Sequence, residues 1–171
     1  MSGNDFNEKF SSKQYVKLTR KSCIHNNYEY KDGLNTDTEN FNSDKTCNGG
    51  GFHFCARADF AKWLLYTNVH DPMYYIWDVH IPDNACVTVI NNNTIKCNQF
   101  ILSNKRSIWD NYDLCMEIVK VDGLMLNYVE QKNQTDELCK EAIRKDERSI
   151  GFVNFPTHEV YMEYVRLKAK N

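Results

Sequence analysis

Residues 28–55, which read YEYKDGLNTDTENFNSDKTCNGGGFHFC, are the stretch around which the rest of the chain is organised. Four of the seven glycines of the chain lie in it, and Gly49, Gly50 and Gly51 are consecutive. Glycine loses more conformational freedom on folding than any other residue, so three in a row indicate unusual backbone angles or a close approach of another group. The run leads directly into an aromatic strand at residues 52–54. A functional site, if the chain has one, is expected here.

Length and composition limit the classes of protein to which the chain can belong. The 171 residues make one ordinary domain, or one domain with a small appendage, and 42% hydrophobic residues are enough for a core. A net charge of -2 gives no electrostatic reason to expect nucleic acid. No apolar run approaches the roughly 20 residues that span a membrane, and the polar N-terminus is not a signal peptide. We therefore expect a protein that is not secreted, with its seven cysteines reduced.

The first 108 residues predict a sheet-rich domain behind a short lead-in. Residues 1–13 are polar and predict a mobile lead-in. Alternation of apolar and polar residues over 14–108 predicts a mainly antiparallel sheet with one packed helix at 58–66, and it leaves open whether the sheet closes toward a barrel. In the clearest strand, at 74–82, alternation places Tyr75, Trp77, Val79 and Ile81 on one face. The other expected strands are 15–19, 23–30, 51–55, 86–90 and 94–102.

From residue 110 the pattern becomes helical and repeats itself. LCMEIV at 114–119 recurs 24 positions later as LCKEAI at 138–143, and LNYV at 126–129 recurs as IGFV at 150–153. A degenerate third copy begins at Val160. One such unit cannot bury its apolar stripe alone, so residues 110–171 predict a small helical repeat block packed on the sheet domain. The expected fold class is therefore α+β.

Several ordered motifs carry a resemblance to a known family. The motifs are YKDGLN at 30–35, Cys47 with the glycine run and its aromatic strand, WDVHIPDNA at 77–85, and Lys96 with FIL at 100–102. Together they resemble an uncharacterised domain of giant DNA viruses of amoebae, often found at the N-terminus of ankyrin-repeat proteins in mimivirus-like genomes. The C-terminal copies resemble a short viral repeat of Leu-Cys-x-x-Ala-Val type, although no ankyrin signature of Thr-Pro-Leu-His type is present. The resemblance implies a viral origin and carries no biochemical function.

Cysteines and histidines of the N-terminal half offer a candidate metal site. The set comprises Cys23, His25, Cys47, His53 and Cys55. Alternating residues of a strand point to the same side, so Cys23 with His25, or His53 with Cys55, could reach one ion. The spacing fits no known zinc finger, and a buried cysteine is an ordinary small hydrophobe. We therefore expect no metal, with this set as the alternative.

A second alternative is an NAD-using enzyme. His25, the strand that contains Tyr30, and the GGFHF segment with His53 loosely resemble the pattern of the poly(ADP-ribose) polymerases. That resemblance implies that His25 contacts the nicotinamide ribose, that Tyr30 stacks on the ring, and that Glu117 or another late acid polarises the ribose. The chain departs from the pattern because Asn26, not glycine, follows His25, and no late glutamate lies in a strand.

Two further chemistries fit less well. Cys55 and His53 share a strand face, so His53 could activate a Cys55 thiolate, with Asp59 or Asp78 orienting the imidazole. The glycine run is not a phosphate loop, because it lacks the Gly-Lys-Ser/Thr ending and leads into a strand instead of a helix.

The sequence favours a non-enzymatic protein-protein interaction module of a giant virus, acting in the host cytoplasm or packaged in the virion. We expect a protein partner, no cofactor, no nucleic acid and no membrane, and the oligomeric state stays open. The alternative is an NAD-dependent ADP-ribosyltransferase-like enzyme that uses His25, Tyr30 and His53. A concave pocket that gathers these residues with Gly50 favours the enzyme, whereas an exposed apolar patch without convergent polar groups favours the binding module.

Overall fold

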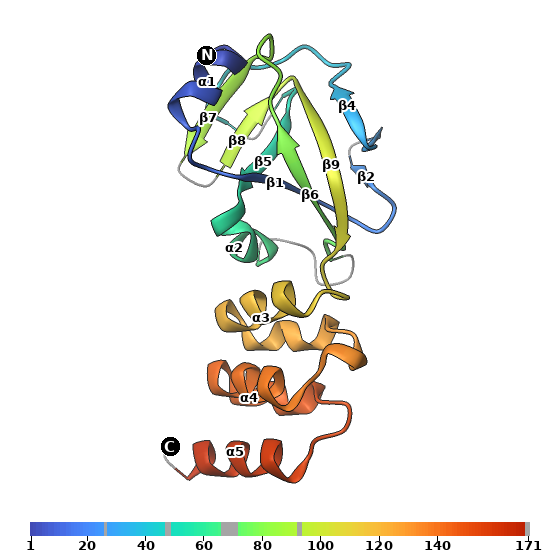
Figure 1. Ribbon diagram of the computed structural model, residues 1–171, viewed down its shortest axis with the longest axis vertical. Coiled ribbons are helices and arrows are strands. Elements are labelled where there is room, and N and C mark those ends of the chain that lie inside the picture. The colour runs from blue at the N-terminus through green and yellow to red at the C-terminus, as the bar shows by residue number, and fades with distance from the viewer. Residues whose placement is uncertain (26, 47–48, 66–71, 92–93, 170–171) are drawn as a thin grey trace. The chain divides into compact units, whose positions relative to one another are not determined.

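The computed structural model describes residues 1–25, 27–46, 49–65, 72–91 and 94–169. The chain forms two compact units, Met1–Arg106 and Ser107–Asn171 (Figure 1). Among the described residues, no helix is long and apolar enough to cross a membrane.

The first unit is built on a seven-stranded sheet with the order β4-β9-β6-β1-β5-β8-β7. A mixed fold with a mostly antiparallel sheet is thus confirmed. Closure into a barrel is not found in the described part of the chain, where β4 and β7 form two separate edges. The strands of the sheet are β1 (Tyr15–Thr19), β4 (Gly33–Thr36), β5 (Phe52–Ala56), β6 (Tyr75–His80), β7 (Val87–Asn91), β8 (Thr94–Cys97) and β9 (Gln99–Ser107). A separate antiparallel ribbon pairs β2 (Ile24–His25) with β3 (Tyr28–Glu29).

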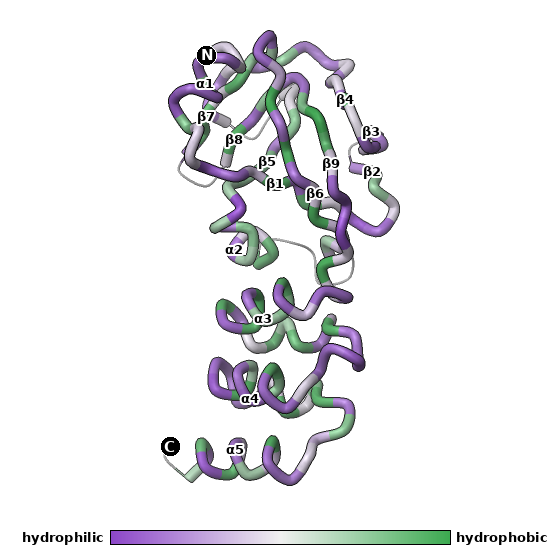
Figure 2. The backbone as a smooth tube through the Cα atoms, in the orientation of Figure 1, coloured by the Kyte–Doolittle hydropathy of each residue, from purple (hydrophilic) through white to green (hydrophobic). Residues whose placement is uncertain are grey.

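Alternation along β5 decides which side chains enter the core. Phe52, Phe54 and Ala56 join the large hydrophobic cluster of the unit, together with Trp77 from β6 and Phe100 from β9. Successive residues of a strand point to opposite faces, so the two residues between them, His53 and Cys55, project to the other side of the sheet. Figure 2 shows the corresponding hydrophobic stretches along the strands.

Two α-helices lie among the described residues of the first unit, where the sequence predicts one. The expected helix at 58–66 is present as the 3-10 turn η1 (Arg57–Asp59) and α2 (Phe60–Leu64), and residue 66 lies outside the described residues. The other helix, α1 (Gly3–Lys9), lies in a segment for which the sequence predicts no helix.

Helix α1 replaces the mobile lead-in predicted for residues 1–13. Ser2 caps the helix by accepting a hydrogen bond from the Asp5 amide, and the Asp5 side chain accepts one from the Ser2 amide in return. The Gly3 amide donates to the Ala85 carbonyl at 2.8 Å. Phe6 is only 1% exposed and packs its ring against the core. The segment is therefore part of the folded unit, because a single aromatic side chain anchors an otherwise polar helix.

The second unit alternates α-helices with 3-10 helices. Its elements are α3 (Tyr112–Val121), η2 (Gly123–Tyr128), η3 (Gln131–Asn133), α4 (Asp136–Lys145), η4 (Glu147–Phe152) and α5 (His158–Lys168). Figure 1 shows α4 layered between α3 and α5. Each of the three α-helices is preceded by an N-cap residue whose side chain accepts a hydrogen bond from the amide three positions later. The N-cap residues are Asn111, Thr135 and Thr157.

A candidate ligand cleft in the first unit

A cleft opens where β1 and β5 separate. The two strands pair only at Tyr15 with Ala56 and at Val16 with Cys55. Beyond these pairs, the ammonium group of Lys17 bridges the strands by donating to the His53 carbonyl at 2.8 Å. The cleft has a volume of about 1330 Å³ and all its lining residues belong to the first unit. Its walls come from the end of β1, the β2–β3 ribbon, the loop after β4 and the glycine run before β5.

The cleft gathers the residues that the sequence pairs with NAD chemistry. His25, Tyr30, His53 and Gly50 all line it, although their catalytic roles stay a prediction. Glu117, the suggested acid, lies in α3 of the second unit. The acids that line the cleft are instead Asp37 and Glu39.

Tyr30 is less available to a ligand than the sequence predicts. It is buried, and its ring contacts those of Tyr28 and Phe52, with centroids 5.1 and 5.4 Å away. Burial raises the pKa of its hydroxyl, so it stays protonated. The half-buried rings of Tyr28 and Trp63 also line the cleft and present more surface to it.

His53 is held as a neutral imidazole. Its half-buried position lowers its pKa to about 4, and the positive charges of Lys17 and Lys96 lower it further in the same direction. Nε2 of His53 is buried and has no hydrogen-bond partner among the described residues. The pKa of His25 is also lowered, by burial and then by Lys17 and Arg20. Both histidines are therefore uncharged at neutral pH.

Lys17 is a buried cation at the edge of the cleft. Its ammonium group lies over the ring of Tyr30, with Nζ 4.6 Å from the ring centre. Burial disfavours the ammonium form and lowers the pKa of Lys17 to about 8. No motif of the sequence points to Lys17, and the one available signal is a lysine inside an otherwise apolar strand.

The glycine run is needed because another side chain approaches its backbone. Gly51 has a φ of +121°, and a Cβ atom there would lie 2.6 Å from Cγ of Lys96. Lys96 is fully buried and its ammonium group donates to the Thr46 carbonyl at 3.1 Å. The Gly51 amide in turn donates to the Asp37 carboxylate. The run therefore joins the loop after β4 to the start of β5.

The candidate metal ligands do not converge. Among the described residues, no group of three or more His, Cys, Asp or Glu side chains is placed to hold an ion, and Cys47 lies outside them. Cys23 has a φ of 59° and is not extended, so the alternation that would bring it beside His25 does not hold. Its sulfur lies 3.2 Å from Nζ of Lys105.

Cys55 is not a nucleophile in this structure. It is fully buried, and burial followed by the charge of Asp59 raises the pKa of its thiol to about 12. A thiolate nucleophile requires a lowered pKa, so the structure contradicts this reading. Asp78, suggested to orient His53, is paired instead with Arg106.

Comparison with known proteins gives a limited result. No family model matches the chain, and no solved structure matches it. The chain is similar to a putative ankyrin repeat protein of Acanthamoeba polyphaga mimivirus, with 28% identity over 116 residues that cover 64% of this chain and 55% of that protein. It thus spans about half the length of this relative. The similarity supports the giant-virus origin that the sequence motifs imply.

Proposed function

We propose that the chain is a protein-protein interaction module of a giant virus and that its helical unit contacts the partner. The observation that carries this proposal is an uncovered apolar face on α5. In α3 and α4 the buried residues are Leu114, Cys115, Ile118 and Val119, and then Leu138, Cys139, Ala142 and Ile143. In α5 only Val160 is buried.

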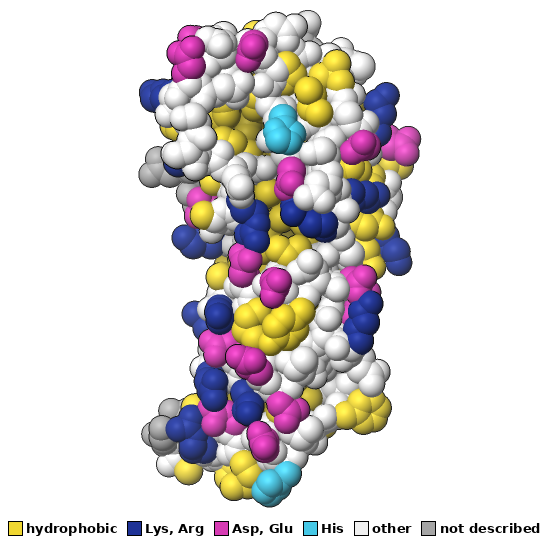
Figure 3. All heavy atoms as spheres, viewed as in Figure 1, with side chains coloured by type: hydrophobic (Ala, Val, Ile, Leu, Met, Phe, Trp, Pro, Cys, Tyr) yellow, Lys and Arg dark blue, Asp and Glu magenta, His cyan; other side chains and the backbone are white. Residues whose placement is uncertain are grey.

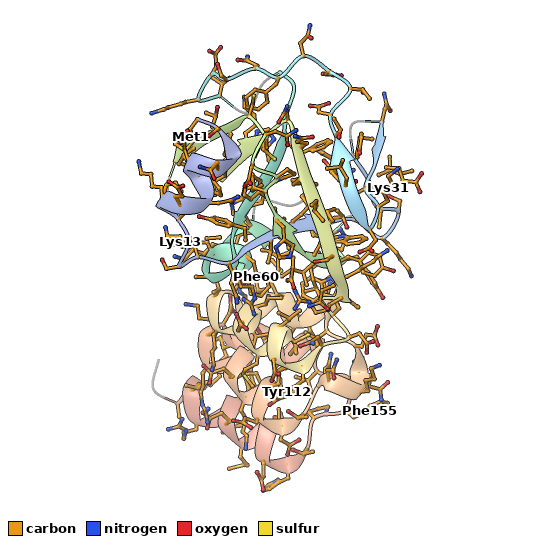
Figure 4. The ribbon with its side chains drawn as sticks, turned by 45° about the horizontal axis from the view of Figure 1, so that its top comes forward. Met1, Lys13, Lys31, Phe60, Tyr112 and Phe155 are labelled. Atoms are coloured by element: carbon orange, nitrogen blue, oxygen red, sulfur yellow. The ribbon has the colours of Figure 1, made fainter. Side chains whose placement is uncertain are left out.

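The uncovered face repeats positions that are buried in the preceding helix. Tyr161 follows Val160 as Cys139 follows Leu138, yet it is 53% exposed. Val165 corresponds to Ile143 and is 39% exposed. Met162 and Phe155 extend the patch, and Phe155 lies at the edge of the unit in Figure 4. Figure 3 shows exposed hydrophobic side chains over this part of the unit. Exposed apolar patches mark interaction surfaces, so this face is suited to covering by another protein.

The similarity to a putative ankyrin repeat protein supports the same proposal. Repeat proteins stack short units and use the resulting surface to bind other proteins. We further propose that residues 14–108 are the viral domain named above, that 110–171 are its attached repeat block, and that the protein acts in the host cytoplasm or the virion.

The test is affinity capture from infected host cells with two matched baits. The double variant Tyr161→Glu, Val165→Glu is expected to lose the proteins that the wild-type chain retains, because two carboxylates would have to be buried on binding. Lys145→Glu, at an exposed site on α4, controls for added negative charge and should retain them. Circular dichroism should show equal helix content in all three. Equal retention by the double variant would contradict the proposal.

A second candidate function is supported by the cleft. We propose as the alternative an NAD-dependent ADP-ribosyltransferase-like activity, because His25, Tyr30 and His53 line one concave site. Release of nicotinamide from NAD, measured by chromatography, is the test. His53→Gln is expected to abolish the release, and the exposed His80→Gln should preserve it. No release by the wild-type protein, with or without added acceptor proteins, would eliminate this candidate.

A further inference from the structure

The first unit contains two buried lysines without a carboxylate partner among the described residues. Lys17 is 6% exposed, and among the described residues its ammonium group contacts the His53 carbonyl and the Tyr30 ring. Lys96 is also buried and belongs to β8, the strand that flanks β5 on the edge away from β1. In the register of these two strands it is paired with His53. A buried charge is costly unless an opposite charge compensates it. Two such charges beside one strand create a strongly positive environment.

Only one of these lysines lines the cleft. The Lys96 side chain turns to the Thr46 carbonyl, behind the glycine run. Lys17 lines the cleft, and Arg20 and Lys62 line it as well. Of the two acids there, Asp37 already accepts a hydrogen bond from the Gly51 amide. Lys62 is paired with Asp59. Lys17 is thus a cation of the described lining for which no carboxylate partner is found among the described residues.

We propose that the cleft binds the phosphate groups of a nucleotide and that the Lys17 ammonium group is their counter-charge. A phosphate supplies the anion that Lys17 lacks, and charge-assisted hydrogen bonds to an ammonium group are stronger than neutral ones. His53 also lines the cleft, and its Nε2 has no partner among the described residues. Tyr28 and Trp63 are half-buried and also line the cleft, and aromatic rings can stack on a base.

This inference concerns binding alone and requires no bond to be broken. It shares the cleft with the transferase candidate and gives a role to Lys17, which that candidate does not use. It does not depend on the α5 face, which lies in the other unit.

The test is isothermal titration of the whole chain with ADP, adenosine and inorganic pyrophosphate. ADP is expected to bind, pyrophosphate to compete with it, and adenosine to bind at least tenfold more weakly. Lys17→Met should weaken ADP binding at least tenfold, because methionine is similar in length to lysine but has no charged hydrogen-bond donor. Lys31→Met, at an exposed lysine that is not among the described lining residues of the cleft, should change ADP binding less than threefold.

The melting temperature separates this role from a structural one. Lys17→Met removes an uncompensated buried charge, so the ligand-free variant should melt no lower than the wild type. If Lys17 served only to join β1 and β5, the variant would melt lower and bind ADP as before, which would overturn the proposal. If Lys17→Met does not fold, Lys17→Arg keeps the charge and should keep ADP binding, and high salt should weaken ADP binding to the wild type.

Other outcomes distinguish this site from the transferase. ADP binding that requires Lys17, without nicotinamide release from NAD, would support the phosphate site and eliminate the enzyme. Nicotinamide release that Lys17→Met leaves unchanged would keep the enzyme and overturn the phosphate site. Absence of ADP binding at millimolar concentration, or equal affinity for adenosine and ADP, would also overturn it.

Discussion

Replacing Gly123 by alanine should destabilise the helical unit by more than about 3 kcal/mol, the upper end of the usual cost of overpacking. A Cβ atom at this position would lie 2.2 Å from the Ala142 carbonyl oxygen and 2.8 Å from Oγ of Ser149. The carbonyl belongs to the backbone of α4 and accepts the hydrogen bond that ends this helix, from the Asp146 amide. The clash therefore cannot be relieved by turning a side chain. Either η2 or α4 must move.

Hydrogen exchange resolved by peptide is the appropriate measurement, because it reports on each unit separately. Protection should fall across residues 107–169 in Gly123→Ala. Gly151→Ala is the matched control, since no atom lies within 4 Å of its added Cβ. The control should keep the wild-type protection or raise it slightly, because alanine restricts the unfolded chain. Equal protection in the two variants would show that the close contact at Gly123 is absent in solution.

Replacing Phe6 by alanine should lower the free energy of unfolding of the first unit by about 3–5 kcal/mol, the usual cost of removing a buried phenylalanine. The ring centroid lies 5.1 Å from that of Tyr15 and 6.2 Å from that of Phe54. The truncation would leave a cavity at the centre of this aromatic group and would detach α1 from the sheet.

Denaturant unfolding followed by tryptophan fluorescence measures this loss. Glu8→Ala, on the exposed side of the same helix, should change the free energy of unfolding by less than about 0.5 kcal/mol. A mobile N-terminus would instead give the same small change for both variants, and would contradict the role of α1.

Helix α1 shows that the polar composition of a short segment does not reveal whether the segment is folded. The first ten residues read as a polar tail only if Phe6 and Phe10 are given no weight. The burial of Phe6 depends on partners that lie farther along the chain, such as Phe54. A local signal was nevertheless present, because Ser2 followed three residues later by Asp5 has the form of a capping box. The alternation of β6 was more informative, since Trp77 and Val79 are both in the core as the pattern predicts.

The candidate site was predictable where its residues lie close in sequence. His25, Tyr30, Gly50 and His53 come from one stretch with turn signals, and the structure places them around one cleft. Lys17 was not predictable in this way, because its burial arises from the packing of distant segments over β1. The pKa of Cys55 was likewise set by burial that no local pattern reveals.

The single buried residue of α5 has a consequence for how a partner would bind. The helix has 11 residues, and helices of this length are marginal in water without tertiary packing. Its ion pairs to the preceding helix, such as Arg144 with Glu163 and Lys140 with Glu159, are partly exposed, and ion pairs at a protein surface contribute about 0–1 kcal/mol each. A protein that covered Tyr161 and Val165 would supply the burial that α5 lacks. Association and the ordering of the last helix would then form one coupled equilibrium, in which the concentration of the partner sets how much of α5 is helical.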